Sequence, residues 1–229
     1  IRLPHISNFT DFMPLEQHEL LGVRYVQHAR ELRQPDMVIL PGTKNTMEDL
    51  LWLRQSGMEA ALLKLAHAGT PVLGVCGGYQ MLGRTLSDPD GLESGRSMTL
   101  SGLGLLPTQT VFNRKKRRMQ VRAAVKPEPF AGASLTGYEI HNGQTQVDGQ
   151  PLCVLSDGSS EGCVSGNVFG TYLHGLFDSG ELTGKLAEFL CARKGIEPKR
   201  TSLLSMEDYR QKQFDLLADG VRHALNLDA

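Results

Sequence analysis

The sequence contains few cysteines, and their spacing excludes the common zinc sites. The four cysteines are Cys76, Cys153, Cys163 and Cys191, and no two of them are separated by two residues. None has a histidine companion at the spacing of a zinc finger. We therefore expect no metal in this domain, and we expect reduced thiols, which are usual in a reducing compartment.

Long apolar runs are also absent. The sequence has no uninterrupted apolar stretch of about 18 residues, the length that a membrane-spanning helix needs. It does not open with a charged segment followed by an apolar one, so no secretory signal is indicated. We expect a cytoplasmic location. Because the chain begins at Ile1 rather than methionine, we also expect an upstream domain that this sequence lacks.

An excess of charge of one sign is missing as well. The chain has 24 lysines and arginines against 25 aspartates and glutamates, for a net charge of -1, so neither nucleic-acid nor membrane binding is expected. The basic run Arg114–Arg118 precedes an alternating stretch at 119–123, which indicates a solvated turn followed by a strand. Contact of this run with an anionic partner is the alternative.

The 229 residues suit one α/β domain, and the clearest elements form a strand-helix-strand unit. Short apolar runs at 37–40 and 72–75 each lead into a glycine turn, which is typical of buried parallel strands. Helical spacing of apolar residues lies between them, at 46–53 and 58–67, and again at 179–194 and 206–225. Weaker patterns suggest strands at 1–6 and 23–26, and an antiparallel or mixed extension over 100–147.

Cys76 lies at the junction of an apolar strand and a helix, in Gly-Val-Cys-Gly-Gly-Tyr-Gln at 74–80. Small residues around a sharp strand-to-helix turn leave room for a nucleophile to project into a cleft. The amides at the start of the following helix favour a thiolate and an oxyanion beside it. A glycine turn kept only for close packing, with a buried structural cysteine, is the alternative.

A cysteine nucleophile needs a base, and His174 is the strongest candidate because it ends a short β run at 170–175. His141 also ends an alternating strand before a glycine turn, so we expect it either to line the site or to be structural. The segment 40–46 follows the preceding strand and would bring a backbone N–H of Gly42 opposite Cys76 as an oxyanion donor. An ordinary capped turn is the alternative for that segment.

Four segments together resemble one family. They are Gly-Val-Cys-Gly-Gly-Tyr-Gln at 74–80, Leu-Pro-Gly-Thr-Lys-Asn-Thr at 40–46, Gly-Tyr-Glu-Ile-His-Asn-Gly at 137–143 and Gly-Thr-Tyr-Leu-His-Gly-Leu-Phe at 170–177. With the opening segment 2–12, they are similar to the class I glutamine amidotransferase domains of the cobyric and cobyrinic acid synthase family. The resemblance covers nearly the whole of 1–229.

The resemblance implies a flavodoxin-like three-layer sandwich with a mostly parallel central sheet. It implies that Cys76 attacks the side-chain amide of glutamine, forms a glutamyl thioester and releases ammonia. The ammonia would serve the amidation of corrinoid carboxylates in cobalamin biosynthesis by an N-terminal synthetase domain. ATP and magnesium would belong to that missing domain, and this domain would need no cofactor.

The resemblance also implies roles for individual residues. Backbone N–H groups of Gly42 and Gly77 would form the oxyanion hole. Residues expected to bind glutamine are Tyr79, Gln80, His141, Asn142 and Gly143.

One feature departs from many class I amidotransferases, which carry a glutamate two positions after the histidine, where this chain has Leu176. Candidates for orienting His174 are Glu139, Asp178 and a backbone carbonyl. Because the usual carboxylate is missing, we expect this domain by itself to be a slow glutaminase that needs its synthetase partner.

Three other functions stay open from the sequence. The same glutaminase chemistry could serve cobyrinic acid a,c-diamide synthesis or amidation of peptidoglycan precursors, although the opening segment 8–12 favours the cobyric acid branch. The chain could be a catalytically silent amidotransferase-like interaction module, which an intact Cys76 and His174 argue against. It could also be another cysteine-dependent hydrolase of related fold, which Gln80 and the segment 137–143 argue against.

Overall fold

Three parallel strands form the centre of the fold in the computed structural model, which describes residues 1–197 and 206–225. They are β1 (Val38–Leu40), β2 (Val72–Val75) and β10 (Val168–Thr171), and β9 (Cys163–Ser165) joins β10 in the antiparallel direction. The strand order is β1-β2-β10-β9. Every residue of β2 and β10 is buried, as expected for parallel strands covered on both faces.

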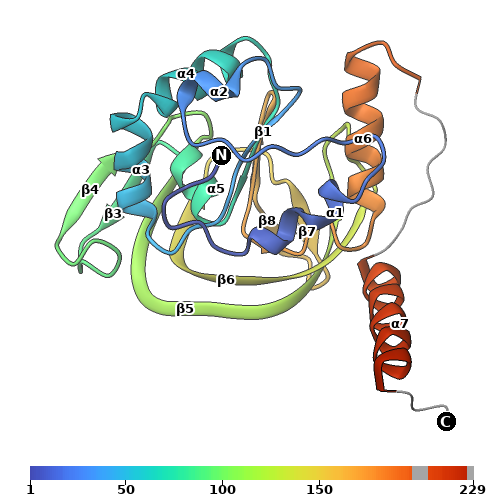
Figure 1. Cartoon of the computed structure of the whole chain (residues 1–229). Coiled ribbons are helices and arrows are strands. Elements are labelled where there is room, and N and C mark those ends of the chain that lie inside the picture. Colours follow the sequence, from blue (N-terminus) through green and yellow to red (C-terminus); the bar gives the residue numbers. More distant parts are fainter. Residues whose placement is uncertain (198–205, 226–229) are drawn as a thin grey trace.

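Helices cover this sheet on both sides, which confirms the expected α/β sandwich. Figure 1 shows α2 (Ala29–Leu32), α3 (Thr46–Gln55) and α4 (Met58–His67) on one side of β1 and α6 (Glu181–Arg193) on the other. The expected helices at 46–53, 58–67, 179–194 and 206–225 are all present. The remaining helices are η1 (Phe9–Phe12), α1 (Met13–Glu16), α5 (Gly77–Leu82) and α7 (Met206–Leu225).

A larger, mostly antiparallel sheet lies beside the parallel one. Its main path is β11-β6-β5-β3-β4, and a long curved hairpin of β5 (Thr108–Val125) and β6 (Ser134–Val147) dominates it (Figure 1). The shorter strands are β3 (Thr85–Asp88), β4 (Met98–Ser101), β7 (Cys153–Leu155), β8 (Ser160–Glu161) and β11 (Leu173–His174). The antiparallel or mixed extension expected over 100–147 is therefore confirmed.

Two sequence expectations about strands are wrong. The segments 1–6 and 23–26 form no strand ladder; Ile6 makes a single isolated bridge to Thr43, and the Arg2 N–H bonds the Val26 carbonyl at 2.8 Å. Pro4 has no N–H to donate, which interrupts any ladder along the first segment. The basic run Arg114–Arg118 is exposed, but it lies within β5, where the pairing with β6 shifts register between Phe112 and Arg117.

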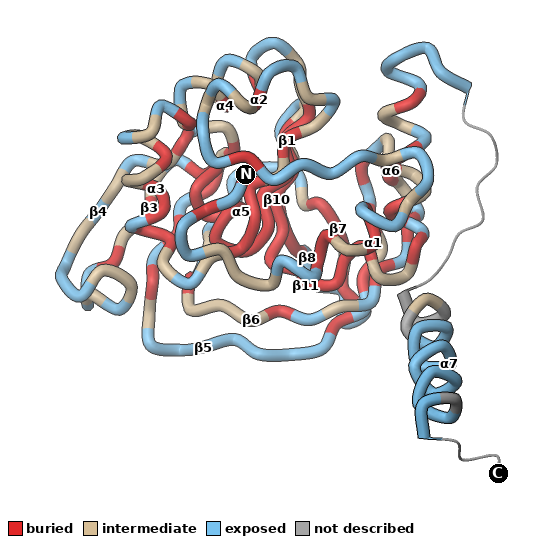
Figure 2. The backbone as a smooth tube through the Cα atoms, viewed as in Figure 1, coloured by how far each residue is buried: buried red, intermediate tan, exposed pale blue. Residues whose placement is uncertain are grey.

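The core gathers around the parallel strands and α5. Figure 2 shows buried residues concentrated there, whereas β5 and α7 are largely exposed. All four cysteines are buried and unpaired. Within residues 1–197 and 206–225, no helix has the length and apolar character needed to cross a membrane.

Candidate active site

Cys76 occupies a strained turn between β2 and α5. Its backbone has φ 51° and ψ −109°, outside the regions that residues with a side chain normally adopt. A conformation of this kind costs on the order of 1–3 kcal/mol and persists only where the surroundings hold it. The Cys76 N–H donates to the Thr171 carbonyl at 2.8 Å, which ties the turn to the end of β10. The sharp strand-to-helix turn expected at Cys76 is confirmed.

The turn depends on a glycine two residues later. A Cβ atom added at Gly78 would stand 2.6 Å from the carbonyl carbon of Leu40 and 2.8 Å from the carbonyl oxygen of Pro41. Backbone atoms cannot yield that much space. Gly78 is therefore the residue that lets α5 start directly against the end of β1.

His174 reaches the same end of the parallel sheet through β10. In the parallel pair of β2 and β10, Thr171 stands opposite Val75, so the chain leaves both strands side by side. His174 follows three residues later in β11, where it pairs with Tyr138 of β6 and stacks on the Tyr138 ring with 5.2 Å between centroids. Only 1% of His174 is exposed. The structure therefore brings Cys76 and His174 to one end of the parallel sheet.

Gly42 lies between these two side chains at the end of β1. A Cβ atom at Gly42 would stand 3.3 Å from His174 Cε1 and 3.6 Å from Cys76 Cβ. Its carbonyl accepts from the Ser7 N–H at 2.9 Å, which fixes the loop against the N-terminal segment. The segments that follow β1, β2 and β10 thus converge, and ligand sites form at such carboxyl ends of parallel strands.

The His174 ring is held by residues that the sequence analysis did not assign. Asp11 Oδ2 stands 2.6 Å from His174 Nδ1, and Asp11 Oδ1 accepts from the Gly175 N–H at 3.2 Å. The Asn8 side-chain nitrogen lies 3.1 Å from Nδ1 and 3.2 Å from Nε2 of the ring. Asp11 is 163 residues away in the chain, and the segment 8–12 was used only as part of a resemblance, so no spacing pointed to it.

Glu139, one of the three candidates for orienting His174, makes its contacts elsewhere. The Glu139 carboxylate forms an ion pair with Arg117, on the neighbouring strand β5, and approaches His141 Nε2 to 4.0 Å. Burial raises the pKa of this carboxyl, while the Arg117 guanidinium lowers it. Strand alternation explains this, because Tyr138 rather than Glu139 stands opposite His174 in the ladder.

The Cys76 sulfur is buried, and this keeps it protonated. Burial raises the pKa of the thiol to about 12, with smaller increases from the nearby Glu93 and Asp11 carboxylates. The Gly77 N–H acts in the opposite direction because it donates toward the sulfur. The thiol also contacts the Ile140 carbonyl at 3.7 Å. Attack by this sulfur therefore requires a base to remove its proton.

Two residues expected to bind glutamine are buried. Tyr79 is 1% exposed and its ring packs edge-on against Tyr172, with 5.1 Å between centroids. The Gln80 amide is engaged at both ends: its oxygen accepts from Thr46 Oγ1 at 3.1 Å, and its nitrogen donates to the Tyr172 hydroxyl at 3.2 Å. Direct contact of either residue with glutamine stays a prediction, and Gln80 has a structural role in the fold.

The segment 141–143 of β6 lies beside Tyr172. His141 stacks on Tyr172 with ring centroids 3.6 Å apart, and its Nδ1 bonds the Gly143 carbonyl at 2.7 Å. Burial lowers the pKa of His141 to about 4, so the ring is neutral and Nδ1 carries the hydrogen. Its buried Nε2 has no hydrogen-bond partner among the residues that the structure describes. Asn142 is partly exposed next to it.

Comparison with curated proteins identifies close relatives along the whole chain. Cobyric acid synthases of Ruminiclostridium cellulolyticum, Moorella thermoacetica and Citrobacter koseri are 41%, 43% and 46% identical to it. The matches cover 99–100% of this chain but only 46–47% of the relatives. The chain therefore spans about half the length of the curated relatives it matches.

Solved structures and family models agree on the fold. A glutamine amidotransferase crystal structure matches 82% of this chain and 95% of its own with a TM-score of 0.58 at 17% identity. The structure of PurLQS from Thermotoga maritima matches 84% of this chain and 95% of its own with a TM-score of 0.59 at 20% identity. The model of the CobB/CobQ-like glutamine amidotransferase domain matches residues 1–182. Sequence, site geometry and fold thus converge, and the chain belongs to the CobB/CobQ-like glutamine amidotransferase family.

Proposed function

We propose that this chain is the glutamine-hydrolysing half of a cobyric acid synthase. The observation that carries the proposal is the strained turn at Cys76. It places a cysteine at the end of the parallel sheet that His174 also reaches, just after β10. A strained non-glycine residue at a strand-to-helix turn is the geometry that nucleophiles use. The three relatives named above are cobyric acid synthases, which favours this acceptor chemistry over cobyrinic acid diamide synthesis and peptidoglycan-precursor amidation.

The first half of the reaction forms a thioester. The Cys76 sulfur attacks the side-chain amide carbon of glutamine, and the thiol proton passes to His174. The carbonyl oxygen becomes an oxyanion, which the backbone N–H groups of Gly42 and Gly77 would stabilise. His174 then returns the proton to the departing nitrogen. Ammonia leaves, and a glutamyl thioester remains on Cys76.

The second half of the reaction restores the thiol. His174 removes a proton from water, and the resulting hydroxide attacks the thioester carbon. The carbon–sulfur bond breaks, the thiolate regains its proton from His174, and glutamate leaves. No cofactor is required by these residues for either step.

The ammonia would be used outside this chain. In the relatives, roughly half of the protein lies beyond the matched region. We propose that this other half is an ATP- and magnesium-dependent synthetase that activates corrinoid carboxylates, so that ammonia converts them to amides. Ammonia transfer assays on the complete synthase, with corrinoid and lipid-linked acceptors in parallel, would separate this acceptor from the peptidoglycan alternative.

The glutaminase assignment is tested by active-site labelling. Diazo-oxo-norleucine mimics glutamine and alkylates a nucleophile in a formed glutamine site. We expect mass spectrometry of the treated wild-type chain to find one adduct, on Cys76, and none in Cys76→Ser. In His174→Ala we expect labelling to slow by about a hundredfold, because the base contributes about 10²–10⁴ in rate.

Two results would contradict this assignment. Equal labelling of Cys76 and the other three cysteines would mean that no glutamine site directs the reagent. Absence of labelling in the complete synthase would instead support a catalytically silent interaction module.

A further inference from the structure

The carboxylate that faces His174 comes from the N-terminal segment, not from the strand that carries the histidine. Asp11 lies in η1, and its two oxygens hold both the ring, at Nδ1, and the next backbone N–H, at Gly175. Asp11 is 5% exposed and His174 is 1% exposed. A charged side chain is buried to this degree only when its hydrogen bonds replace its lost hydration.

These contacts fix the position of the hydrogen on the imidazole. The Asp11 carboxylate can only accept, so the neutral ring must carry its hydrogen on Nδ1. The Asn8 amide nitrogen stands 3.1 Å from Nδ1 and 3.2 Å from Nε2, and with the hydrogen on Nδ1 only Nε2 has a lone pair that can accept from it. The Nδ1–H tautomer is the one that satisfies both neighbours. It is also the tautomer in which Nε2 keeps the lone pair that can receive a proton when the Asn8 amide gives way.

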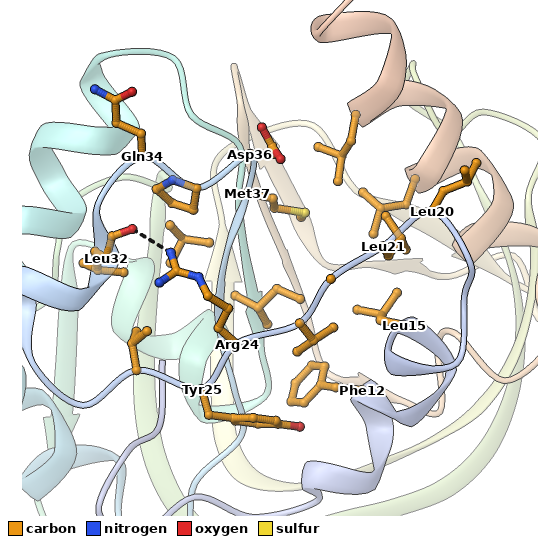
Figure 3. Close-up of a pocket in the computed structure, with 18 of the residues that line it drawn as sticks. Phe12, Leu15, Leu20, Leu21, Arg24, Tyr25, Leu32, Gln34, Asp36 and Met37 are labelled. Carbon is orange, nitrogen blue, oxygen red and sulfur yellow. Dashed lines mark hydrogen bonds between the residues drawn. The ribbon is translucent and has the colours of Figure 1, made fainter. Parts of the chain in front are cut away.

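The segment that carries Asp11 is anchored independently of the active site. Phe12 and Leu15 are 4% and 3% exposed, and Figure 3 shows both among the side chains that line a cavity of about 370 Å³. This cavity lies between the N-terminal segment and the end of α6, and neither Cys76 nor His174 lines it. Apolar packing on one side of the segment thus holds the carboxylate on the other side.

We infer that Asp11 is the positioning residue of the glutaminase, in place of the glutamate that other class I amidotransferases carry after the histidine. This inference rests on the proposed function. When Cys76 transfers its proton to Nε2, the ring becomes an imidazolium, and the ionised Asp11 stabilises it while Nδ1 keeps its hydrogen. The hydrogen bonds of Asp11 go to the His174 ring and the Gly175 N–H, so its role is to position the base.

The Asp11→Asn variant tests this role with little change in shape. An asparagine oxygen can still accept from the Gly175 N–H, but its NH₂ group would then face His174 Nδ1. That ring nitrogen must become an acceptor, which moves the hydrogen to Nε2. We expect ¹⁵N NMR of the ring to report Nδ1–H in the wild type and Nε2–H in Asp11→Asn. Labelling of Cys76 by diazo-oxo-norleucine should fall by about a hundredfold or more.

Asp49→Asn is the matched control for the NMR measurement. Asp49 is also fully buried and also bonds a histidine, His5, at 2.9 Å from Nδ1. We expect the His174 tautomer to be unchanged in this variant. Asp11→Glu, which keeps the charge, should recover part of the labelling rate that Asp11→Asn loses.

The outcomes separate this inference from the proposed function. Nε2–H in the wild type, or Nδ1–H retained in Asp11→Asn with undiminished labelling, would overturn the role of Asp11. The wild-type spectrum alone shows which ring nitrogen of His174 carries the hydrogen, so this part of the test does not depend on the folding of a variant. Failure of wild-type Cys76 to label, with the tautomers as expected, would count against the glutaminase assignment and leave the Asp11–His174 pairing supported.

Discussion

At the residue scale, Gly42 is the position where the smallest change should separate activity from stability. A methyl group there would stand 3.3 Å from His174 Cε1, closer than a relaxed contact. The His174 ring is buried and held by Asp11, so it can move aside only by losing that hydrogen bond. Displacements of about 1 Å among reacting groups cost about a hundredfold in rate.

We therefore expect Gly42→Ala to lower kcat/KM for glutamine hydrolysis by about ten- to a hundredfold while the melting temperature changes little. Gly22→Ala is the matched control, because a Cβ atom at Gly22 would meet nothing within 4 Å. Steady-state ammonia release and thermal denaturation measure the two properties. An unchanged kcat/KM in Gly42→Ala would mean that the site has room beside His174 that the structure does not provide.

At the scale of elements, one buried carboxylate connects three strands. Glu161 of β8 accepts from the Tyr172 N–H at 2.6 Å, from Thr171 Oγ1 at 2.7 Å and from Cys153 Sγ at 3.2 Å. It thereby joins β7 to the chain between β10 and β11, just before His174. Burial raises its pKa from 4.5 to about 7, although the donors from Tyr172, Thr171 and Cys153 lower it.

The raised pKa of Glu161 predicts a pH-dependent stability. The folded protein holds this proton more tightly than the unfolded chain, so the contribution is complete below about pH 4.5 and is lost as the pH rises through about 7. At one pKa unit per 1.36 kcal/mol, the loss is at most about 3 kcal/mol.

The Glu161→Gln variant isolates this effect because it cannot ionise and keeps an oxygen for the Tyr172 N–H. We expect urea denaturation to show a larger decline in unfolding free energy between about pH 5 and about pH 8 for the wild type than for this variant. Glu188→Gln, an exposed change in α6, should decline as the wild type does. Parallel pH curves for wild type and Glu161→Gln would show that Glu161 stays ionised in the folded state.

At the scale of the whole molecule, the sequence predicts slow glutamine hydrolysis by the isolated chain because the usual carboxylate after the histidine is missing. Asp11 supplies a carboxylate beside His174, so the missing glutamate cannot be the cause. The buried Cys76 thiol supplies another, because its pKa of about 12 leaves almost no thiolate near neutral pH. Contact with a synthetase half would have to open or align this end of the sheet.

We expect the isolated chain to hydrolyse glutamine at least about tenfold more slowly than the same chain joined to its synthetase half, a typical coupling between two sites. Ammonia release per active site measures both forms, with Cys76→Ser as the background in each. Active-site titration with diazo-oxo-norleucine ensures that only competent sites are counted. Equal turnover numbers would contradict the dependence on a partner.

Local patterns in the sequence were enough for the parallel strands, the longer helices α3, α4, α6 and α7, and the turn at Cys76. Each depends on residues close together in the chain: an apolar run predicts a buried strand, and small residues beside Cys76 permit the sharp turn. The strand at 1–6 was predicted wrongly because its apolar spacing carries no information about which backbone partner is available. Pro4 and the absence of a neighbouring ladder decided against it.

The sequence by itself determined the family, the parallel strands and the longer helices, and it predicted Cys76 and His174 as nucleophile and base. Only the tertiary structure decided which carboxylate accompanies His174, because Asp11 lies 163 residues before it and has no periodicity or spacing to mark it. The same holds for Glu139, which strand alternation turns toward Arg117, and for Gln80, which packing commits to Thr46 and Tyr172. Local patterns depend on residues that are close together in the chain. These contacts form only when distant segments come together in the folded protein.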